Sequence, residues 1–416
     1  MSAGRTVHVI GAGLAGLSAA LVLADAGRPV TLHEAGPQAG GRCRSYFDRE
    51  LGCVVDNGNH LLLSGNRAVF AYIDRIGARD TLGGPGEAFF PFLDPRSGER
   101  WTVRPSAGRL PWWIFSPTRR VPGTQPLDYF SLLRLRLARA HSSVASVLPH
   151  GVLYERLLEP LAIAALNTRP EVGLASLLAA VVRETLMQGG AACVPWFPRA
   201  SLAASLVDPA LDALRATGAT VRLGQRIAAL RIAGNRVTEL GTSFGPSPVA
   251  PGEAVVLAVP PSVAAGLIPG LRSPDAFEAI LNVHFRAEAD GGKAGFIGLV
   301  GGVAEWVFAK PGHVSVTISA ANRMVDQPGE AIAAAVWPDV RAALGLSGAM
   351  PTWRVVKEKR ATFAATAEQE RLRPAARTGL VNLALAGDWT ATGLPGTIEG
   401  AIRSGVTAAK LFLHAA

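Results

Sequence analysis

A glycine-rich turn between an apolar strand and a helix near the N-terminus constrains the fold of this chain more than any other feature. Residues 7–10 read Val-His-Val-Ile, and Gly11, Gly13 and Gly16 follow in the spacing G-x-G-x-x-G. The first glycine permits the tight bend, the second lets a pyrophosphate approach the backbone, and the third lets the new helix pack on the strand. The segment therefore predicts a Rossmann-like β-α-β unit whose helix N-terminus favours an anion.

An acid at the end of the next strand makes this prediction specific. Glu34 follows residues 30–33, a second short apolar strand, about 20 residues after the last glycine. A carboxylate there can accept hydrogen bonds from both ribose hydroxyls of an adenosine. Glycine turns alone are weak signals in a chain with 46 glycines. With the strand, the helix and the acid together, the motif predicts a site for the ADP half of a dinucleotide.

A second motif near the C-terminus describes the other half of the same ligand. Residues 383–386 form a short apolar run, and Gly387-Asp388 follow it, at the strand tip where ligands bind in open α/β sheets. Asp388 is placed to bond a ribitol hydroxyl, and a helix from about Ile398 would direct its N-terminus at the flavin ring. We therefore predict FAD. We expect it to be held non-covalently, because residues 392–396 contain no Cys or His for a covalent link.

Composition limits the remaining possibilities. A chain of 416 residues with 49% apolar content suits two interleaved domains. Three cysteines without a C-x-x-C pair argue for a reducing compartment and against a metal site. No run of about 18 apolar residues is present to span a membrane. The net charge of +9 comes without a basic aromatic stripe, a zinc finger or a helix-turn-helix pattern, so we expect no nucleic acid partner.

The chain resembles the flavin amine oxidase and phytoene desaturase superfamily in three short segments. Gly41-Arg42 falls within the Gly-Gly-Arg that follows the ribose-binding acid in that group, Gly58-Asn59-His60 matches its Gly-x-His near the flavin ring, and Val259-Pro260-Pro261 ends a buried strand as it does there. The resemblance implies that Arg42 neutralises the pyrophosphate and that the segment at Ile227 meets the adenine. The residues assigned to the cofactor are Gly11, Gly13, Leu14, Ala15, Gly16, Glu34, Ala35, Gly41, Arg42, Gly58, Asn59, His60, Ile227, Gly387, Asp388, Thr397, Ile398 and Ala401.

We expect an α/β fold in which a Rossmann-like FAD-binding domain of the GR2 type is interleaved with an α+β substrate domain. Apolar periodicity predicts helices over 127–188 and strands over 277–320, followed by a helix at 328–344 and a strand at 353–357. The expected FAD-binding segments are 1–82, 200–265 and 376–416. The expected substrate-domain segments are 83–199, mainly helical, and 266–375, an antiparallel sheet.

Three classes of flavoenzyme share the expected fold, and each is a possible function of this chain. No second G-x-G-x-x-G follows a strand, so electrons must come from the substrate, from free reduced flavin or from an external donor. An amine oxidase usually carries a lysine in the first strand after Val-Pro-Pro, and Asn282 stands there instead. A carotenoid or phytoene-type desaturase is the second class. A flavin-binding scaffold without enzymatic activity is a further alternative.

The third class is narrower and is indicated by segments along nearly the whole chain. Residues 159–168, 282–284, 359–363 and 392–401 look like those of the squalene-associated flavoproteins, the hydroxysqualene dehydroxylases of bacterial hopanoid pathways. The resemblance implies reductive dehydroxylation of hydroxysqualene to squalene by hydride from reduced flavin. Loss of the hydroxyl needs an acid and the exclusion of bulk water. The polar candidates for catalysis are His60, Asn59, Asn167 and His284, although a lone histidine on an apolar strand is more often a core residue.

A long terpenoid substrate lives in the bilayer, so we expect a cytoplasmic protein that is peripheral at the inner face of the cell membrane. The segment 109–120, with Trp112, Trp113, Ile114 and Phe115 between arginines, is the candidate docking surface on anionic lipid, together with the Leu/Arg helix after it. The alternative is that these aromatic residues belong to the core of the substrate domain.

Overall fold

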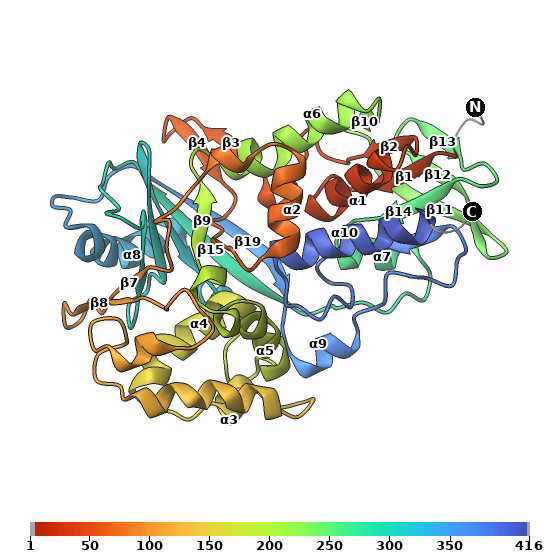
Figure 1. Ribbon diagram of the computed structural model, residues 1–416. Helices are drawn as coiled ribbons and strands as arrows, with labels where there is room; N and C mark the ends of the chain where they lie inside the picture. The colour runs from red at the N-terminus through yellow and green to blue at the C-terminus, as the bar shows by residue number, and fades with distance from the viewer. Residues whose placement is uncertain (1–4, 414–416) are drawn as a thin grey trace.

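The structure, a computed structural model, describes residues 5–413 and builds the α/β fold on two large sheets (Figure 1). The first sheet has five parallel strands in the order β10-β2-β1-β14-β20. These strands are β1 (Val7–Ile10), β2 (Val30–His33), β10 (Thr220–Arg222), β14 (Ala254–Leu257) and β20 (Leu383–Leu385). The central strands β1 and β14 are wholly buried, as their continuous apolar sequences require between two layers.

Helices from both ends of the chain cover this sheet. The Ala/Leu-rich helix α1 (Leu14–Asp25) follows the glycine turn and packs along α10 (Ile398–Leu413), the last helix of the fold. Figure 1 shows these two helices side by side, with α2 (Arg67–Arg75) against the N-terminal end of α10. The packing of α1 on α10 therefore brings the two predicted halves of the cofactor site together.

The second sheet has seven strands in the order β19-β15-β18-β17-β16-β7-β8, antiparallel except for the parallel pair β16 and β7. These strands are β7 (Phe90–Leu93), β8 (Arg100–Val103), β15 (Phe277–Phe285), β16 (Phe296–Leu299), β17 (Trp306–Lys310), β18 (His313–Ile318) and β19 (Trp353–Phe363). Helix α8 (Gly329–Leu344) covers one face through an apolar cluster that includes Val283, Val316 and Val336. The opposite face, called the inward face below, contacts the loop at Asn59 through Ser315 and Thr317.

The segment 127–188 is helical as predicted, but it is divided into several short helices. They are η4 (Pro126–Leu137, a 3₁₀ helix), α3 (Val144–Val147), η5 (Tyr154–Leu158, a π turn), α4 (Glu159–Leu166) and α5 (Ala175–Glu184). The aperiodic stretch before them holds the strands β7 and β8, for which the sequence shows no pattern. Strands of four residues, one with Pro91 inside it, are too short for alternation to be seen.

Smaller elements complete the fold. Between β10 and β14 lie the antiparallel strands β11 (Ile227–Ala233), β12 (Arg236–Thr242) and β13 (Gly245–Pro248). Further elements include η3 (Trp112–Phe115), η8 (Ala203–Val207), α6 (Asp208–Ala216), α7 (Pro261–Leu267), α9 (Ala367–Arg371), the hairpin β3 (Ser45–Asp48) and β4 (Cys53–Asp56), and the strands β5 (Leu62–Leu63), β6 (Leu82–Gly83) and β9 (Pro195–Pro198).

Candidate cofactor and active site

The N-terminal turn has the geometry that the glycine spacing requires. Gly11 has φ +102°, and a Cβ there would lie 2.5 Å from the Ala258 carbonyl oxygen. A Cβ on Gly16 would overlap the carbonyl oxygen of Gly11, so helix α1 and strand β1 pack in direct backbone contact. Gly13 caps α1 without a side chain, which leaves the amides of the first helical turn available to an anion.

Glu34 is fixed at the end of β2 by both of its carboxylate oxygens. Oε2 accepts a hydrogen bond from the Ala12 amide, and Oε1 accepts one from the Gly36 amide, each at 2.8 Å. The carboxylate therefore holds the glycine turn against the loop that follows β2. Each oxygen keeps a further lone pair for a ribose hydroxyl.

An ion pair joins the two ends of the chain at the site. Arg42 Nη2 lies 2.5 Å from Asp388 Oδ1, and Arg42 Nη1 donates to the carbonyl of Ala361 at 2.6 Å. Asp388 is buried, whereas the Arg42 side chain is 43% exposed. The Gly387 amide before it donates to Ser404 on α10. The structure thus places Arg42 beside Asp388, and its contact with the pyrophosphate stays a prediction.

The remaining predicted contacts lie around this junction. A Cβ on Gly41 would lie 3.4 Å from the Cα of Gly13, so two glycine backbones face each other there. Thr397 Oγ1 accepts from the Gly400 amide and caps α10 just before Ile398. Ile227 is buried at the start of β11. The glycine cradle, the amides of α1 and the acids Glu34 and Asp388 fit a dinucleotide that lies across the carboxyl ends of the parallel strands.

Glu399 has a role that the sequence does not reveal. Its two oxygens accept from the amides of Ala68 and Val69 at 3.0 and 2.9 Å, and it also pairs with Arg403. Glu399 therefore caps α2 and, from the first turn of α10, also complements the dipole of its own helix. Because the capped helix is far away in the chain, only the tertiary fold reveals this contact.

Two of the four catalytic candidates are tied into the second sheet. Asn167 ends α4 with φ +46°, and its amide accepts from Ala320 N at 2.7 Å and donates to Thr362 Oγ1 at 3.0 Å. These bonds link the helical region to the sheet. His284 is fully buried beside Ser315, and burial lowers its pKa to about 3, so the ring is neutral.

The other two candidates line a small pocket formed by the loop after β4, by β9 and by β17. Asn59 Nδ2 donates to Ser315 Oγ at 2.7 Å and to Thr317 Oγ1 at 3.0 Å, while its Oδ1 is buried without a partner among the described residues. His60 lines the same pocket, and burial lowers its pKa to about 4. Both residues follow Gly58 on one loop, as the Gly-x-His resemblance requires.

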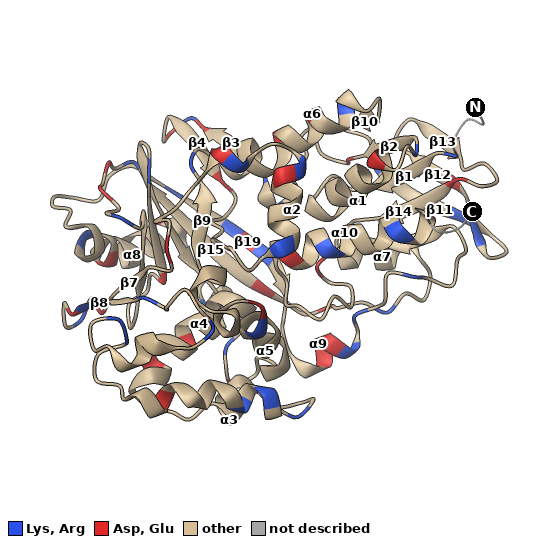
Figure 2. Ribbon diagram, in the orientation of Figure 1, with Lys and Arg blue, Asp and Glu red and all other residues tan. Residues whose placement is uncertain are grey.

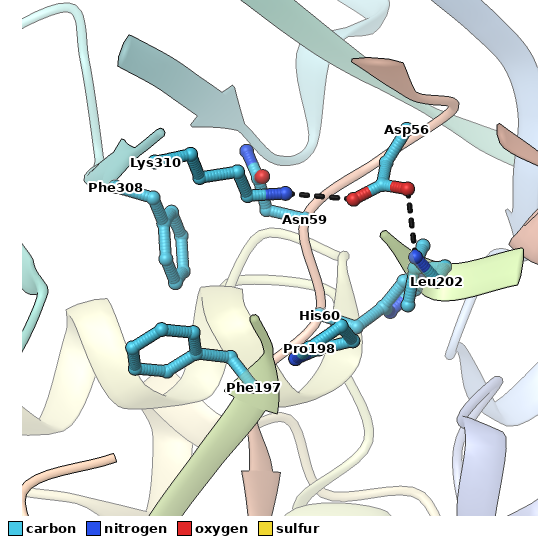
Figure 3. Close-up of a pocket in the computed structure, with 8 residues that line it drawn as sticks. All are labelled: Asp56, Asn59, His60, Phe197, Pro198, Leu202, Phe308 and Lys310. Carbon is cyan, nitrogen blue, oxygen red and sulfur yellow. Dashed lines mark hydrogen bonds and ion pairs between the residues drawn. The ribbon is translucent and has the colours of Figure 1, made fainter. Parts of the chain in front are cut away.

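A buried ion pair, which no sequence pattern predicts, also lines this pocket. Lys310 Nζ lies 2.7 Å from Asp56 Oδ2, and the two side chains are 7% and 2% exposed (Figure 3). Burial alone would raise the pKa of the Asp56 carboxyl, but the Lys310 ammonium beside it holds that pKa below its usual range. Asp56 directly precedes the Gly-x-His loop, but nothing in the sequence connects it to Lys310 on β17.

Buried neutral histidines predict a loss of stability in mild acid. Burial lowers the pKa of His33 to about 4, below the unfolded value of 6.5. The unfolded state therefore binds more protons between pH 6.5 and 4, and stability is present above pH 6.5 and lost as the pH falls through this window. His60 and His284 act in the same direction.

We expect the free energy of unfolding to fall by about 1.4 kcal/mol per pH unit for each such histidine. Chemical denaturation at pH 7 and pH 5 measures the slope. His33→Gln is expected to flatten it, while His141→Gln at an exposed position leaves it unchanged. Equal slopes in wild type and His33→Gln would contradict the assignment.

Comparison with known proteins gives the class of this chain. Residues 14–289 and 306–413 match the family described as flavin containing amine oxidoreductase. Solved structures of a putative protoporphyrinogen oxidase from Exiguobacterium and of an oxidoreductase from Methanosarcina mazei share the fold. Their TM-scores are 0.67 and 0.71 at 17% and 16% identity, each over 98% of this chain and 98% and 100% of theirs. The chain is thus a flavoprotein, and FAD is its cofactor.

Relatives with a higher sequence identity identify a narrower family within these flavoproteins. The hydroxysqualene dehydroxylases of Sinorhizobium fredii and Rhodopseudomonas palustris are each 50% identical to this chain, over 98% and 99% of both chains. The hydroxysqualene dehydroxylase of Zymomonas mobilis is 45% identical over 98% of both. The chain belongs to the hydroxysqualene dehydroxylase family within the flavin containing amine oxidoreductases.

Proposed function

We propose that this protein is an FAD-dependent oxidoreductase of squalene and hopanoid biosynthesis that reductively removes the hydroxyl of hydroxysqualene to give squalene. The observation that carries the proposal is the identity of 45–50% to hydroxysqualene dehydroxylases over essentially full length. Bound FAD, once reduced, supplies a hydride. The residues of the chain would hold the cofactor across the tips of the parallel strands, and the loop from Gly58 to His60 leads to a buried pocket lined by both aromatic and charged side chains.

The position of Asn282 argues against amine oxidation. Its side-chain amide donates to the Asn57 carbonyl at 3.2 Å and accepts from Thr317 Oγ1 at 2.9 Å. A fully engaged neutral amide replaces the lysine that the amine oxidases carry at this point. Desaturation of a carotenoid or phytoene is the second alternative, and the near full-length relatives do not favour it.

The proposal requires an external electron donor or free reduced flavin, because the sequence has no second dinucleotide motif. Anaerobic reduction of the bound flavin followed by rapid mixing with hydroxysqualene tests this scheme. We expect the absorbance of oxidised flavin to return in a substrate-dependent phase. A flavin that stays reduced under these conditions would contradict the proposal.

We further propose that the protein works at the cytoplasmic face of the membrane and docks through residues 110–137. Among the described residues no helix is long and apolar enough to cross a bilayer. Large apolar side chains of this segment are nevertheless exposed, by 67% at Trp112, 57% at Phe115, 79% at Leu127 and 85% at Leu137. An apolar patch of this kind on one region supports contact with a lipid surface.

The structure corrects which residues of the segment can face lipid. Trp113 and Ile114 are 5% and 1% exposed and belong to the core of the helical region, so their assignment to the docking surface was wrong. In η4 the i, i+3 spacing of a 3₁₀ helix places Leu127, Phe130 and Leu133 on one exposed face. Figure 2 shows basic residues at the end of this helical region near α3, suited to anionic headgroups.

A liposome flotation assay tests the docking surface. The wild type is expected to float with anionic vesicles in a salt-sensitive way, and a Trp112→Ser/Phe115→Ser/Leu127→Ser variant is expected to stay at the bottom. The matched control is Phe244→Ser/Val381→Ser, which removes two equally exposed apolar side chains elsewhere. If the triple variant floats as well as the wild type while retaining FAD, the docking surface lies elsewhere.

A further inference from the structure

The side chains on the inward face of the seven-stranded sheet change from polar to aromatic from one strand to the next. On β15 and β18 it is polar, with Asn282, His284, Ser315 and Thr317. On β17, β16 and β7 it becomes aromatic, because Phe308 stands opposite Ser315 and Phe296 stands opposite Phe308 in register. The polar half contacts the Gly-x-His loop, since Asn59 bonds to Ser315 and Thr317.

The aromatic half forms a cluster of its own. The rings of Phe308 and Phe296 lie 5.8 Å apart, and Phe197 from β9 meets both at 6.3 Å with its edge. The rings of Trp306 and Phe90 pack on Phe296 at 6.0 and 6.3 Å. These contacts place five aromatic rings beside the polar half of the sheet.

The pocket described above sits where the two halves meet. Figure 3 shows the rings of Phe197 and Phe308 near the Lys310 side chain, whose ammonium points to Asp56. Its lining residues are Asp56, Asn59, His60, Phe197, Pro198, Leu202, Phe308 and Lys310. The pocket between the polar and the aromatic half of the sheet therefore combines an ammonium, a carboxylate and two aromatic rings. The ammonium and the carboxylate are shielded from bulk water.

The same loop connects this pocket with the cofactor site. Asn57 Nδ2 donates to the Arg42 carbonyl at 3.3 Å, next to the Arg42–Asp388 pair. Three residues further on, His60 lines the pocket. The loop thus connects the lining of the pocket with the Arg42–Asp388 pair of the predicted cofactor site.

We propose that this pocket is where the allylic C–O bond of the substrate breaks, with Lys310 as the proton donor and with Phe197 and Phe308 stabilising the cation that results. The inference rests on the proposed function. Aromatic faces attract a cation through the ring quadrupole, and most strongly where water is excluded.

The step balances in protons, charge and electrons. The Lys310 ammonium gives its proton to the substrate hydroxyl, the C–O bond breaks, and the oxygen leaves as water. One positive charge moves from Lys310 to the allylic carbon, and the Asp56 carboxylate remains beside it as a counter-charge. The bound FAD, once reduced, would supply the hydride for the new C–H bond, and Lys310 would regain its proton from bulk water.

A binding experiment tests the cation site without turnover. The probe is an azasqualene whose protonated amine replaces the carbinol carbon, compared with squalene itself. Quenching of tryptophan fluorescence in the oxidised holoenzyme gives both dissociation constants. The wild type is expected to prefer the ammonium probe, and Phe308→Leu is expected to lose about ten- to thirty-fold of that preference while its squalene affinity is unchanged. An equal preference in both proteins would overturn the assignment of Phe308.

Kinetics test the proton donor. Because Lys310→Met alone leaves a buried unpaired carboxylate, the informative variant is Asp56→Asn/Lys310→Met, which removes both charges. We expect a fall in kcat of about a hundredfold or more with FAD content and squalene affinity retained. A double variant with wild-type kcat would overturn the role of Lys310.

The exposed Phe244→Leu serves as the control for aromatic loss. If the wild type makes no squalene, the proposed function is wrong. If it does while Phe308→Leu keeps both kcat and ammonium preference, only the pocket assignment is wrong.

Discussion

Asp388→Ala is expected to weaken FAD binding by about 2 kcal/mol, or roughly thirtyfold. The substitution removes the buried carboxylate that bonds Arg42 and that we predict to meet the ribitol, and it leaves the guanidinium without this partner. The penalty stays moderate because water reaches the 43% exposed Arg42 side chain. Fluorescence titration of the FAD-free protein with FAD measures the change.

The control for this prediction is Asp212→Ala. Asp212 also pairs with an arginine, Arg215, but the pair is exposed on the surface of α6 and contributes little. Equal FAD affinities for Asp388→Ala and the control would mean that the Arg42–Asp388 pair does not support the cofactor.

Gly405→Ala is expected to destabilise the protein by about 3 kcal/mol. A Cβ there would overlap the carbonyl oxygen of Ala15 and lie 2.9 Å from the Ala19 amide, so α10 must move away from α1. Both helices begin at the predicted cofactor site, and FAD affinity is therefore expected to fall as well. Urea unfolding of the holoprotein measures the stability change.

Gly266→Ala is the matched control because a Cβ at that position in α7 meets no atom within 4 Å. Alanine there is expected to stabilise the helix by up to about 1 kcal/mol. A Gly405→Ala variant as stable as wild type would contradict the close packing of α1 on α10.

Local motifs predicted the backbone geometry at the glycine turn and the place of the acid after β2. Gly11 and Glu34 could be assigned because turn, helix and acid are close in sequence and each has one physical reason. Asp388 followed from its place after an apolar strand. That Arg42 pairs with Asp388, and Lys310 with Asp56, could not be predicted, because these pairs join segments hundreds of residues apart.

The exposure of individual residues in the docking segment also could not be predicted from the sequence. Trp112 and Trp113 are adjacent and chemically alike, yet one is 67% exposed and the other 5%. The short 3₁₀ helix η3 turns them to opposite sides, and Trp113 packs edge-on against Tyr129. Sequence composition identified the segment, but only the backbone conformation separates its surface from its core.

The most direct test is the reaction itself. Purified holoprotein with reduced flavin and hydroxysqualene is incubated without oxygen, and the products are identified by gas chromatography with mass spectrometry. The account predicts squalene in equal amount to the flavin oxidised, and no peroxide when small amines are offered in air. Unchanged hydroxysqualene, or a product with more double bonds than squalene, would contradict it.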